Sequence, residues 1–253
     1  MKTAAFVPVR LSSTRLPSKA LLEIQGKPCI EYLIDRIKQI KELDEIVICT
    51  TKNKIDDKIV DLAQKINVSI FRGSETDILD RFKNAAEKFN VQNIVNIDGD
   101  DILCEPEFIK ETANELKKNI VDYISWKNMP LGTTPIGIKY EAIKTICDRK
   151  DIKNTETGWG KFFTETRLFK VKVLTSDDPK LIDHDVRLTL DYKEDFKLFE
   201  QILTNLKKPF DLRDVLDFLH SRKDINDLNR NIKDDYWKNF KKKSTKIKMK
   251  DES

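Results

Sequence analysis

The chain of 253 residues contains little glycine, and most of it lies in the second half. Only Gly26 and Gly73 occur before residue 90. Neither the dinucleotide fingerprint GxGxxG nor the phosphate-binding loop GxxxxGK[ST] is therefore present in the first half of the sequence. A nucleotide bound near the N-terminus would have to be held by side chains instead of by a glycine-rich loop.

Histidine and cysteine are also scarce, and apolar runs are short. The two histidines and four cysteines show no CxxC pair and no zinc-ligand spacing. Cys29 and Cys49 lie among apolar residues, where we expect small core thiols in a reducing compartment. No apolar run approaches the length of about 18 residues that suggests a membrane helix. No signal peptide is visible, so we expect a cytoplasmic protein without stable membrane insertion.

The net charge of +4 is distributed unevenly along the chain. The segment 238–250 carries seven lysines and no acid, which leaves the rest of the chain slightly acidic. We therefore predict one domain at 1–237 followed by a basic disordered tail at 238–253. Such a tail could contact nucleic acid or an anionic membrane. We favour the simpler alternative, a solvated terminus, and expect no nucleic-acid partner.

The first half of the sequence alternates between strand and helix patterns. Apolar residues recur at helical spacing in three segments, and short apolar runs lie between those segments. We expect strands at 3–9, 45–51, 68–71 and 93–98, and helices at 28–40, 54–66 and 76–89. This order predicts an α/β fold with right-handed crossovers and a mostly parallel sheet. From 120 to 180 the pattern is less regular, with strand-like runs between proline and glycine turns.

A basic loop follows the first predicted strand. Arg10, Arg15 and Lys19 lie there, and Ser12 to Thr14 supply hydroxyl groups between the two arginines. Arginine forks and a lysine point charge suit a polyphosphate, which offers several charged oxygens. The alternative is a solvated loop that only connects a strand to a helix.

Acidic residues follow two later strands. Asp98, Asp100 and Asp101 come directly after the fourth predicted strand, and such closely spaced carboxylates repel each other unless a divalent cation binds them. The alternative is an ordinary acidic turn. Asp191 follows another strand-like run, directly before a predicted helix, and could simply begin that helix.

The basic loop and the acids are expected at the same edge of the sheet. Ligands of parallel sheets bind beyond the carboxyl ends of the strands, where these segments would meet. Three cations opposite separated carboxylates predict a site for a metal ion and a polyphosphate. Catalysis at such a site would depend on positioning and charge neutralisation.

The N-terminal segment resembles a signature of the cytidylyltransferases that activate acidic sugars. These include the CMP-Kdo synthetases, the acylneuraminate cytidylyltransferases and the spore-coat-polysaccharide type. The pattern R-x-x-S-[ST]-R-x-P-x-K is matched by Arg10, Ser13, Thr14, Arg15, Pro17 and Lys19. The G-K-P that usually follows it is present at Gly26 to Pro28. The resemblance covers roughly residues 2–206. It implies a Rossmann-like nucleotidyltransferase fold with a small β-rich insertion, at about 120–180, for acceptor binding and dimerisation.

The resemblance also implies roles for individual residues. Arg10, Arg15 and Lys19 would be catalytic, and Asp100 and Asp191 would bind Mg²⁺. The nucleotide would contact a larger set, made up of Pro8, Val9, Arg10, Ser13, Arg15, Lys19, Arg72, Gly73, Asp80, Arg81 and Asp98. Two departures from the family pattern are the late Pro106 after "DDILCE" and "DYKED" in place of "DTPED".

The implied reaction transfers CMP from CTP to an acidic sugar, such as a 2-keto sugar acid, and releases pyrophosphate. A homodimer is also implied. Two other hypotheses stay open: a sugar-phosphate nucleotidyltransferase that uses another nucleotide or acceptor, and a non-catalytic nucleotide-binding homologue. The segment 154–169 matches no pattern that identifies the acceptor.

Overall fold

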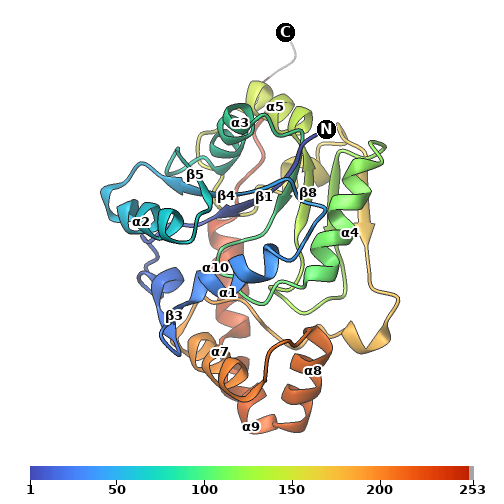
Figure 1. The fold of residues 1–253 in the computed structure, drawn as a ribbon. Helices are drawn as coiled ribbons and strands as arrows, with labels where there is room; N and C mark the ends of the chain where they lie inside the picture. Colours follow the sequence, from blue (N-terminus) through green and yellow to red (C-terminus); the bar gives the residue numbers. More distant parts are fainter. Residues whose placement is uncertain (251–253) are drawn as a thin grey trace.

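A computed structural model describes residues 1–250. Its centre is a sheet with strand order β5-β4-β1-β6-β8-β7-β9, flanked by helices (Figure 1). The strands are β1 (Thr3–Pro8), β4 (Glu45–Thr51), β5 (Ser69–Gly73), β6 (Asn93–Asn96), β7 (Tyr123–Trp126), β8 (Ile136–Lys139) and β9 (Val171–Leu174). A separate two-stranded hairpin is formed by β2 (Glu23–Ile24) and β3 (Lys27–Pro28).

The strands of the sheet run mostly in parallel, as the alternating pattern predicts. Strand β8 is antiparallel to both its neighbours, β6 and β7, and the other pairings are parallel. Strand β1 lies between β4 and β6, so the chain changes direction across the sheet on either side of β1. Ligands of open α/β sheets bind at such a switch point.

Helices cover both faces of the sheet because β1 points alternate side chains to opposite sides. Ala5 and Val7 belong to one apolar cluster, while Ala4 and Phe6 belong to the other. The first cluster includes residues of α1 (Cys29–Ile37), α2 (Asp57–Lys65) and α4 (Pro106–Lys117). The second includes residues of α3 (Ile78–Phe89), α5 (Tyr140–Arg149) and α6 (Lys161–Thr164).

The C-terminal part is helical and lies beyond one end of the sheet (Figure 1). It consists of α7 (Lys193–Asn205), α8 (Leu212–Ser221), α9 (Lys223–Asn226) and α10 (Lys233–Lys243). Short 3₁₀ turns lie at Lys19–Leu21, Lys54–Asp56, Pro179–Leu181 and Asp227–Ile232. No helix among residues 1–250 combines the length and the apolar character that crossing a membrane requires.

The lysine-rich segment 238–250 differs from the disordered tail that its composition suggested. Its first residues complete α10, and Thr245 is buried and donates from its backbone N–H to the carbonyl of Thr157, at 2.7 Å. Ile247 and Met249 pack against the apolar cluster that contains α3 and α5. Apolar residues among the lysines hold residues 238–250 against the rest of the protein, and the expected tail residues 251–253 lie outside the described residues.

The segment 120–180 is rich in strands, as expected, and these strands extend the central sheet. Strands β7, β8 and β9 join the central sheet as its last three strands. Their backbone hydrogen bonds continue the sheet from β6, since Ile94 pairs with Ile138 and Ile138 with Tyr123. Strand β9 forms the outer edge and pairs with β7 alone among the described strands.

Candidate active site

A cavity of about 570 Å³ lies at the carboxyl ends of β1 and β6. Its walls are the loop after β1, the acidic loop after β6, the segment 156–161 and one side of α10. Of the residues predicted from the sequence, it brings together Pro8, Val9, Arg10, Ser13, Arg15, Lys19, Arg81, Asp98, Asp100 and Asp191.

The loop after β1 is folded by contacts of its own backbone and two apolar anchors. Leu11 and Leu16 are buried. The N–H of Leu11 donates to the carboxylate of Asp56 at 2.8 Å, and the N–H of Ser18 donates to the carbonyl of Leu11 at 3.3 Å. With its apolar side chains turned inward, the loop presents its basic side chains to the cavity.

Lys19 joins the two acids that the sequence singled out. Its Nζ donates to the carboxylate of Asp100 and, at 2.7 Å, to Oδ1 of Asp191. Arg15 donates to the same Asp191 oxygen at 2.5 Å. Burial alone would raise the pKa of Asp191, but the charges of Lys19 and Arg15 hold it well below its usual range. Asp191 is therefore a permanently charged carboxylate in the cavity wall.

The acidic loop is held against the loop after β1. The N–H of Gly99 donates to the carbonyl of Pro8 at 3.0 Å. A Cβ atom at position 99 would lie only 2.9 Å from that carbonyl oxygen, so glycine permits the close approach. The N–H of Leu190 donates to the carbonyl of Asp100 at 2.9 Å, which ties the Asp191 segment to the same loop.

The carboxylates of this loop fit a divalent cation. Oxygens of Asp98, Asp100 and Asp101 lie within 4.8 Å of one another. Asp98 lines the cavity with its carboxylate open to it, and the dense protein around it, together with the charge of Asp100, raises its pKa to about 6. A bound cation would relieve this crowding, and oxygen ligands suit Mg²⁺. Since Lys19 contacts both Asp100 and Asp191, these two carboxylates already converge on one position of positive charge.

A buried network that sequence reasoning missed supports Asp191 from behind. Arg187 donates to Oδ2 of Asp191 at 3.3 Å and to both oxygens of Asp195 at 3.1 Å. Asp195 accepts the N–H of Asp191 at 2.9 Å and the side-chain N–H of Asn229 at 2.8 Å. Asp191 thus has its backbone and both carboxylate oxygens fixed. The signal in the sequence was the pair of further charges flanking Asp191 at 187 and 195.

The opposite end of the cavity contains a second group of charges. Arg81 is almost fully buried and forms an ion pair with Glu156, which also lies 3.6 Å from Nε of Arg10. Trp159 packs edge-on against Phe82 beside this pair. Nε of Arg81 is buried without a hydrogen-bond partner.

Three residues of the predicted nucleotide set lie outside the cavity lining. Arg72 donates to the carbonyls of Thr51 and Asn53, both at 2.8 Å, and to Asp57 at 2.6 Å, so it braces the loop after β4. Gly73 leaves room for the side chain of Arg81, because a Cβ there would meet its Cγ at 2.9 Å. Asp80 lies in the first turn of α3.

One wall of the cavity is α10, which was not predicted from the sequence because this segment is rich in lysine. Tyr236, Asn239, Phe240 and Lys243 of α10 line the cavity, at the spacing i, i+3, i+4 and i+7 of a single helix face. This spacing was the available signal, but the dense positive charge beside it favoured a disordered tail. The segment 156–161, for which no pattern was recognised, forms the facing wall.

Comparisons with known proteins agree with this geometry. Residues 4–225 match the cytidylyltransferase family. An uncharacterized protein of Methanocaldococcus jannaschii is 35% identical over 240 residues, which are 92% of this chain and 96% of that protein. A spore coat polysaccharide biosynthesis protein of Bacillus subtilis is 28% identical over 202 residues, 76% of this chain and 82% of that protein. A 3-deoxy-manno-octulosonate cytidylyltransferase of Geobacter sulfurreducens is 32% identical over 119 residues, 47% of each chain.

The fold is also that of a solved relative. A cytidylyltransferase from Leptospira borgpetersenii superposes with a TM-score of 0.81 at 24% identity, covering 89% of this chain and 97% of that chain. The predicted family and the predicted α/β nucleotidyltransferase fold are therefore confirmed. The family match spans most of the chain and includes the loop after β1, the acidic loop and Asp191. The chain belongs to the cytidylyltransferase family and is a CTP-dependent cytidylyltransferase.

Proposed function

We propose that the protein transfers CMP from CTP to an acidic sugar, a 2-keto sugar acid or a related acceptor, and releases pyrophosphate. The observation that carries this proposal is the convergence of Lys19, Arg15, Asp100 and Asp191 in one cavity. Cations for a triphosphate and carboxylates for a metal ion meet there at the switch point of the sheet. The relatives from Geobacter sulfurreducens and Bacillus subtilis support a role in surface polysaccharide biosynthesis.

The basic loop holds the triphosphate in this proposal. Arg10, Arg15 and Lys19 bind its oxygens and stabilise the charge that develops on the departing pyrophosphate. The acceptor hydroxyl oxygen attacks the α-phosphorus, a new P–O bond forms, and the hydroxyl proton passes to solvent. The bond between the α-phosphorus and the oxygen that bridges it to the β-phosphate breaks, and its electron pair leaves on pyrophosphate. Because the residues only position and neutralise charge, the barrier falls chiefly through preorganisation.

Asp100 and Asp191 would hold Mg²⁺, with Asp98 close enough to assist. The chemistry that bound Mg²⁺ supplies is charge neutralisation at the phosphoryl group being transferred. Lys19 contacts both carboxylates and would exchange these contacts for phosphate oxygens when CTP and the cation bind.

An anionic acceptor agrees with the charges of the remaining wall. Lys161 and Lys243 line the cavity, and neither side chain forms an ion pair within residues 1–250. The four other cations of the lining are paired with carboxylates. Two uncompensated lysines beside the substrate space favour an acceptor that carries a carboxylate.

The test is pyrophosphate release from each of the four ribonucleoside triphosphates with a panel of 2-keto sugar acids. We expect CTP to be preferred and EDTA to abolish release. The product is identified by mass spectrometry as the CMP conjugate of one acid. The proposal would be contradicted if none of the four nucleotides gave pyrophosphate. It would also be contradicted if Lys19→Ala and Asp100→Ala both left the rate of release unchanged. A preference for another nucleotide with a sugar phosphate would favour the sugar-phosphate nucleotidyltransferase instead.

A homodimer is the second part of the proposal. Val171 and Val173 on edge strand β9 are 38% and 50% exposed. They point to the same side of the strand, since side chains two residues apart share a face. Unpaired backbone groups and apolar side chains on an edge strand favour association with another strand. A second copy of the chain is the partner that the family resemblance implies.

A further inference from the structure

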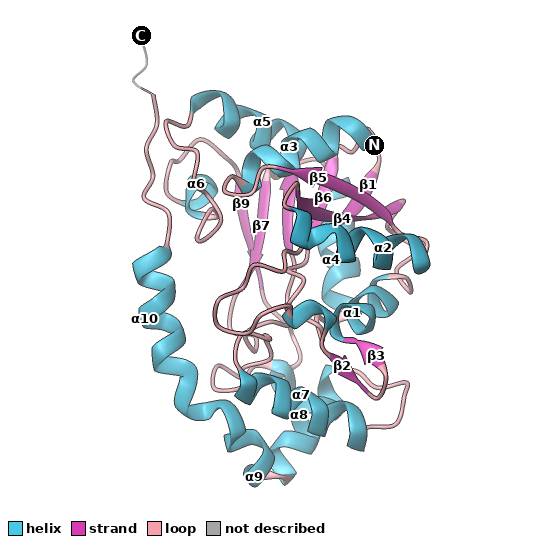
Figure 2. Ribbon diagram, turned by 90° about the vertical axis from the view of Figure 1, so that its left-hand side faces the viewer, coloured by secondary structure: helices cyan, strands magenta, loops and turns pink. Residues whose placement is uncertain are grey.

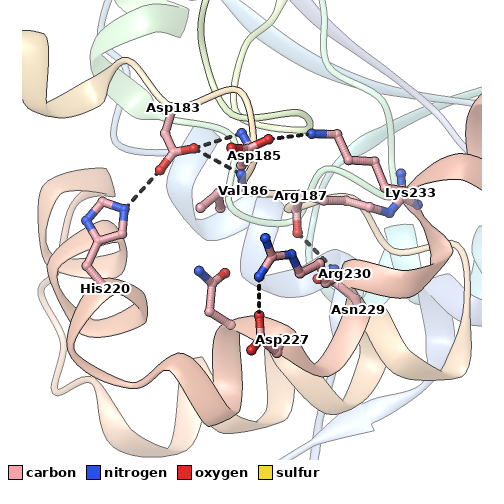
Figure 3. Close-up of a pocket in the computed structure, with 10 residues that line it drawn as sticks. Asp183, Asp185, Val186, Arg187, His220, Asp227, Asn229, Arg230 and Lys233 are labelled. Carbon is pink, nitrogen blue, oxygen red and sulfur yellow. Dashed lines mark hydrogen bonds and ion pairs between the residues drawn. The ribbon is translucent and has the colours of Figure 1, made fainter.

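Helix α10 crosses one side of the molecule between the C-terminal helices and the sheet (Figure 2). At its first residue, Lys233 Nζ donates to Asp185 at 2.9 Å (Figure 3). It also donates to the carbonyl of His184 at 2.9 Å. Beyond its last residue, Thr245 is hydrogen-bonded to Thr157. No side chain of α10 is fully buried, so the helix is fixed at its ends and by a few contacts along the cavity.

The first of these contacts joins α10 to the network behind Asp191. The guanidinium carbon of Arg187 lies 4.1 Å from the centroid of the Tyr236 ring. This distance is typical of a cation–π interaction, which is strong when water is excluded. Arg187 is 3% exposed and donates to Oδ2 of Asp191. The ring of Tyr236 therefore covers the guanidinium that holds one oxygen of Asp191.

The second contact reaches the other oxygen of Asp191. One turn along α10, the amide of Asn239 donates to the hydroxyl of Tyr192 at 3.2 Å. The ring of Tyr192 lies 5.3 Å from the guanidinium carbon of Arg15, and Arg15 donates to Oδ1 of Asp191. Thus α10 supports both arginines that hold Asp191, through Tyr236 on one side and through Asn239 on the other.

The role of the small cavity behind this network is structural. It measures about 250 Å³ and is lined by two ion pairs of the loop before Arg187: Lys233–Asp185 joins this loop to α10, and His220–Asp183 joins it to α8 (Figure 3). Asn229 lies at its wall and donates to the backbone carbonyl of Arg187 at 3.0 Å. The base of α10 and the backbone of Arg187 are thereby fixed relative to each other.

We propose that Tyr236 and Asn239 are positioning residues, which fix the Asp191 carboxylate through Arg187, Tyr192 and Arg15. This inference rests on the proposed function, in which Asp191 holds the metal ion. Arginine side chains that lose a packed ring regain rotamer freedom, and the carboxylate they orient then moves with them. The consequence falls on the chemical step and on metal binding, whereas capture of the triphosphate by Arg10 and Lys19 is retained.

The test compares Tyr236→Leu with Tyr236→Phe. We expect Tyr236→Leu to lower kcat by about 10- to 100-fold with the KM for CTP changed less than about twofold. Tyr236→Phe keeps the ring over Arg187 and should retain the activity of the wild-type protein. Phe89→Leu is the matched control, because Phe89 is also a partly buried aromatic residue of a helix, its ring centroid lies 5.2 Å from Nζ of Lys88, and it does not line the cavity. Asn239→Ala, a smaller change, should lower kcat by about threefold, a loss typical of one weak hydrogen bond.

A second measurement needs no turnover. Mn²⁺ binding in the presence of CTP, followed by electron paramagnetic resonance, should weaken about tenfold in Tyr236→Leu and stay unchanged in Tyr236→Phe and Phe89→Leu. Thermal unfolding of the variants identifies any loss of fold. Equal kcat and Mn²⁺ binding in Tyr236→Leu and the wild-type protein would overturn the inference, and so would equal losses in the Leu and Phe variants. Absence of pyrophosphate release by the wild-type protein would instead overturn the proposed function.

Discussion

At the scale of single residues, Lys19 is the centre of the site because it joins two carboxylates. Lys19 is 14% exposed in its side chain and contacts two carboxylates from different segments. Burial alone would lower its pKa, but Asp100 and Asp191 raise it above its ordinary value. Lys19 is therefore a fixed positive charge, and no proton-transfer role follows from it.

Replacing Lys19 by Met should lower kcat for CMP transfer by about 100- to 1,000-fold, since it removes a preorganised charge from the reacting phosphates. Steady-state pyrophosphate release measures the effect. Lys27→Met is the matched control, because Lys27 pairs with Asp35 and does not line the cavity. Similar rates for Lys19→Met and Lys27→Met would show that Lys19 only connects two segments of the protein.

At the scale of secondary structure elements, two helices begin with the same arrangement in different surroundings. At the start of α7, Asp195 accepts the N–H of Tyr192 at 2.9 Å and is fully buried beside Arg187. At the start of α8, Asp214 accepts the N–H of Asp211 at 3.0 Å at the protein surface. The same local interaction is thus part of the active-site network at the start of α7, whereas at the start of α8 it stabilises only the end of the helix.

Replacing Asp195 by Ala should lower the free energy of unfolding by about 3–5 kcal/mol, because it leaves the charge of Arg187 buried with fewer partners. Asp214→Ala removes the N3 carboxylate of an exposed capping box and should cost about 0.3–1.5 kcal/mol. Urea denaturation of the two variants provides the comparison. Equal losses of unfolding free energy in the two variants would mean that the buried network behind Asp191 contributes no stability beyond that of an ordinary helix cap.

The elements of the first half could be predicted because each has a simple period. Apolar residues such as Ile30 and Ile37 repeat at helical spacing, and the parallel strands β1 and β6 lead into the loops that carry Lys19 and Asp100. Asp191 reaches the same place from a segment outside the named strands. The rest depended on tertiary contacts. The antiparallel direction of β8 is set by its pairing with β6 and β7, and α10 is held by an arginine remote in sequence. Neither contact leaves a local pattern.

The predicted site was incomplete for the same reason. Arg187 and Asp195 flank Asp191 in the sequence, but only the fold turns them toward it and buries them. Arg72 matches the family motif, yet its side chain is directed to the loop after β4. A motif fixes which residue type is present, whereas the direction of a side chain follows from what it packs against.

At the scale of the whole molecule, we expect a homodimer that uses the edge of the sheet. Light scattering after size-exclusion chromatography should give twice the mass of the 29.5 kDa chain. Val173→Lys should shift the protein toward the monomer, because a charge on an edge strand opposes pairing with another chain. Leu228→Lys is the control, since Leu228 is also exposed, at 36%, but lies in a 3₁₀ turn remote from β9 in the sequence. A monomeric wild-type protein, or dissociation by Leu228→Lys alone, would contradict this expectation.

The late position of α10 in the chain has a consequence for biosynthesis. The ribosome makes the basic loop, the acidic loop and the Asp191 network before it makes residues 233–250, which close the cavity and carry Tyr236. A nascent chain can therefore form the sheet while Arg187 still lacks the ring that covers it. A growing chain completes the lining of the cavity only after residues 233–250 have emerged and docked, because Tyr236, Asn239, Phe240 and Lys243 belong to that lining.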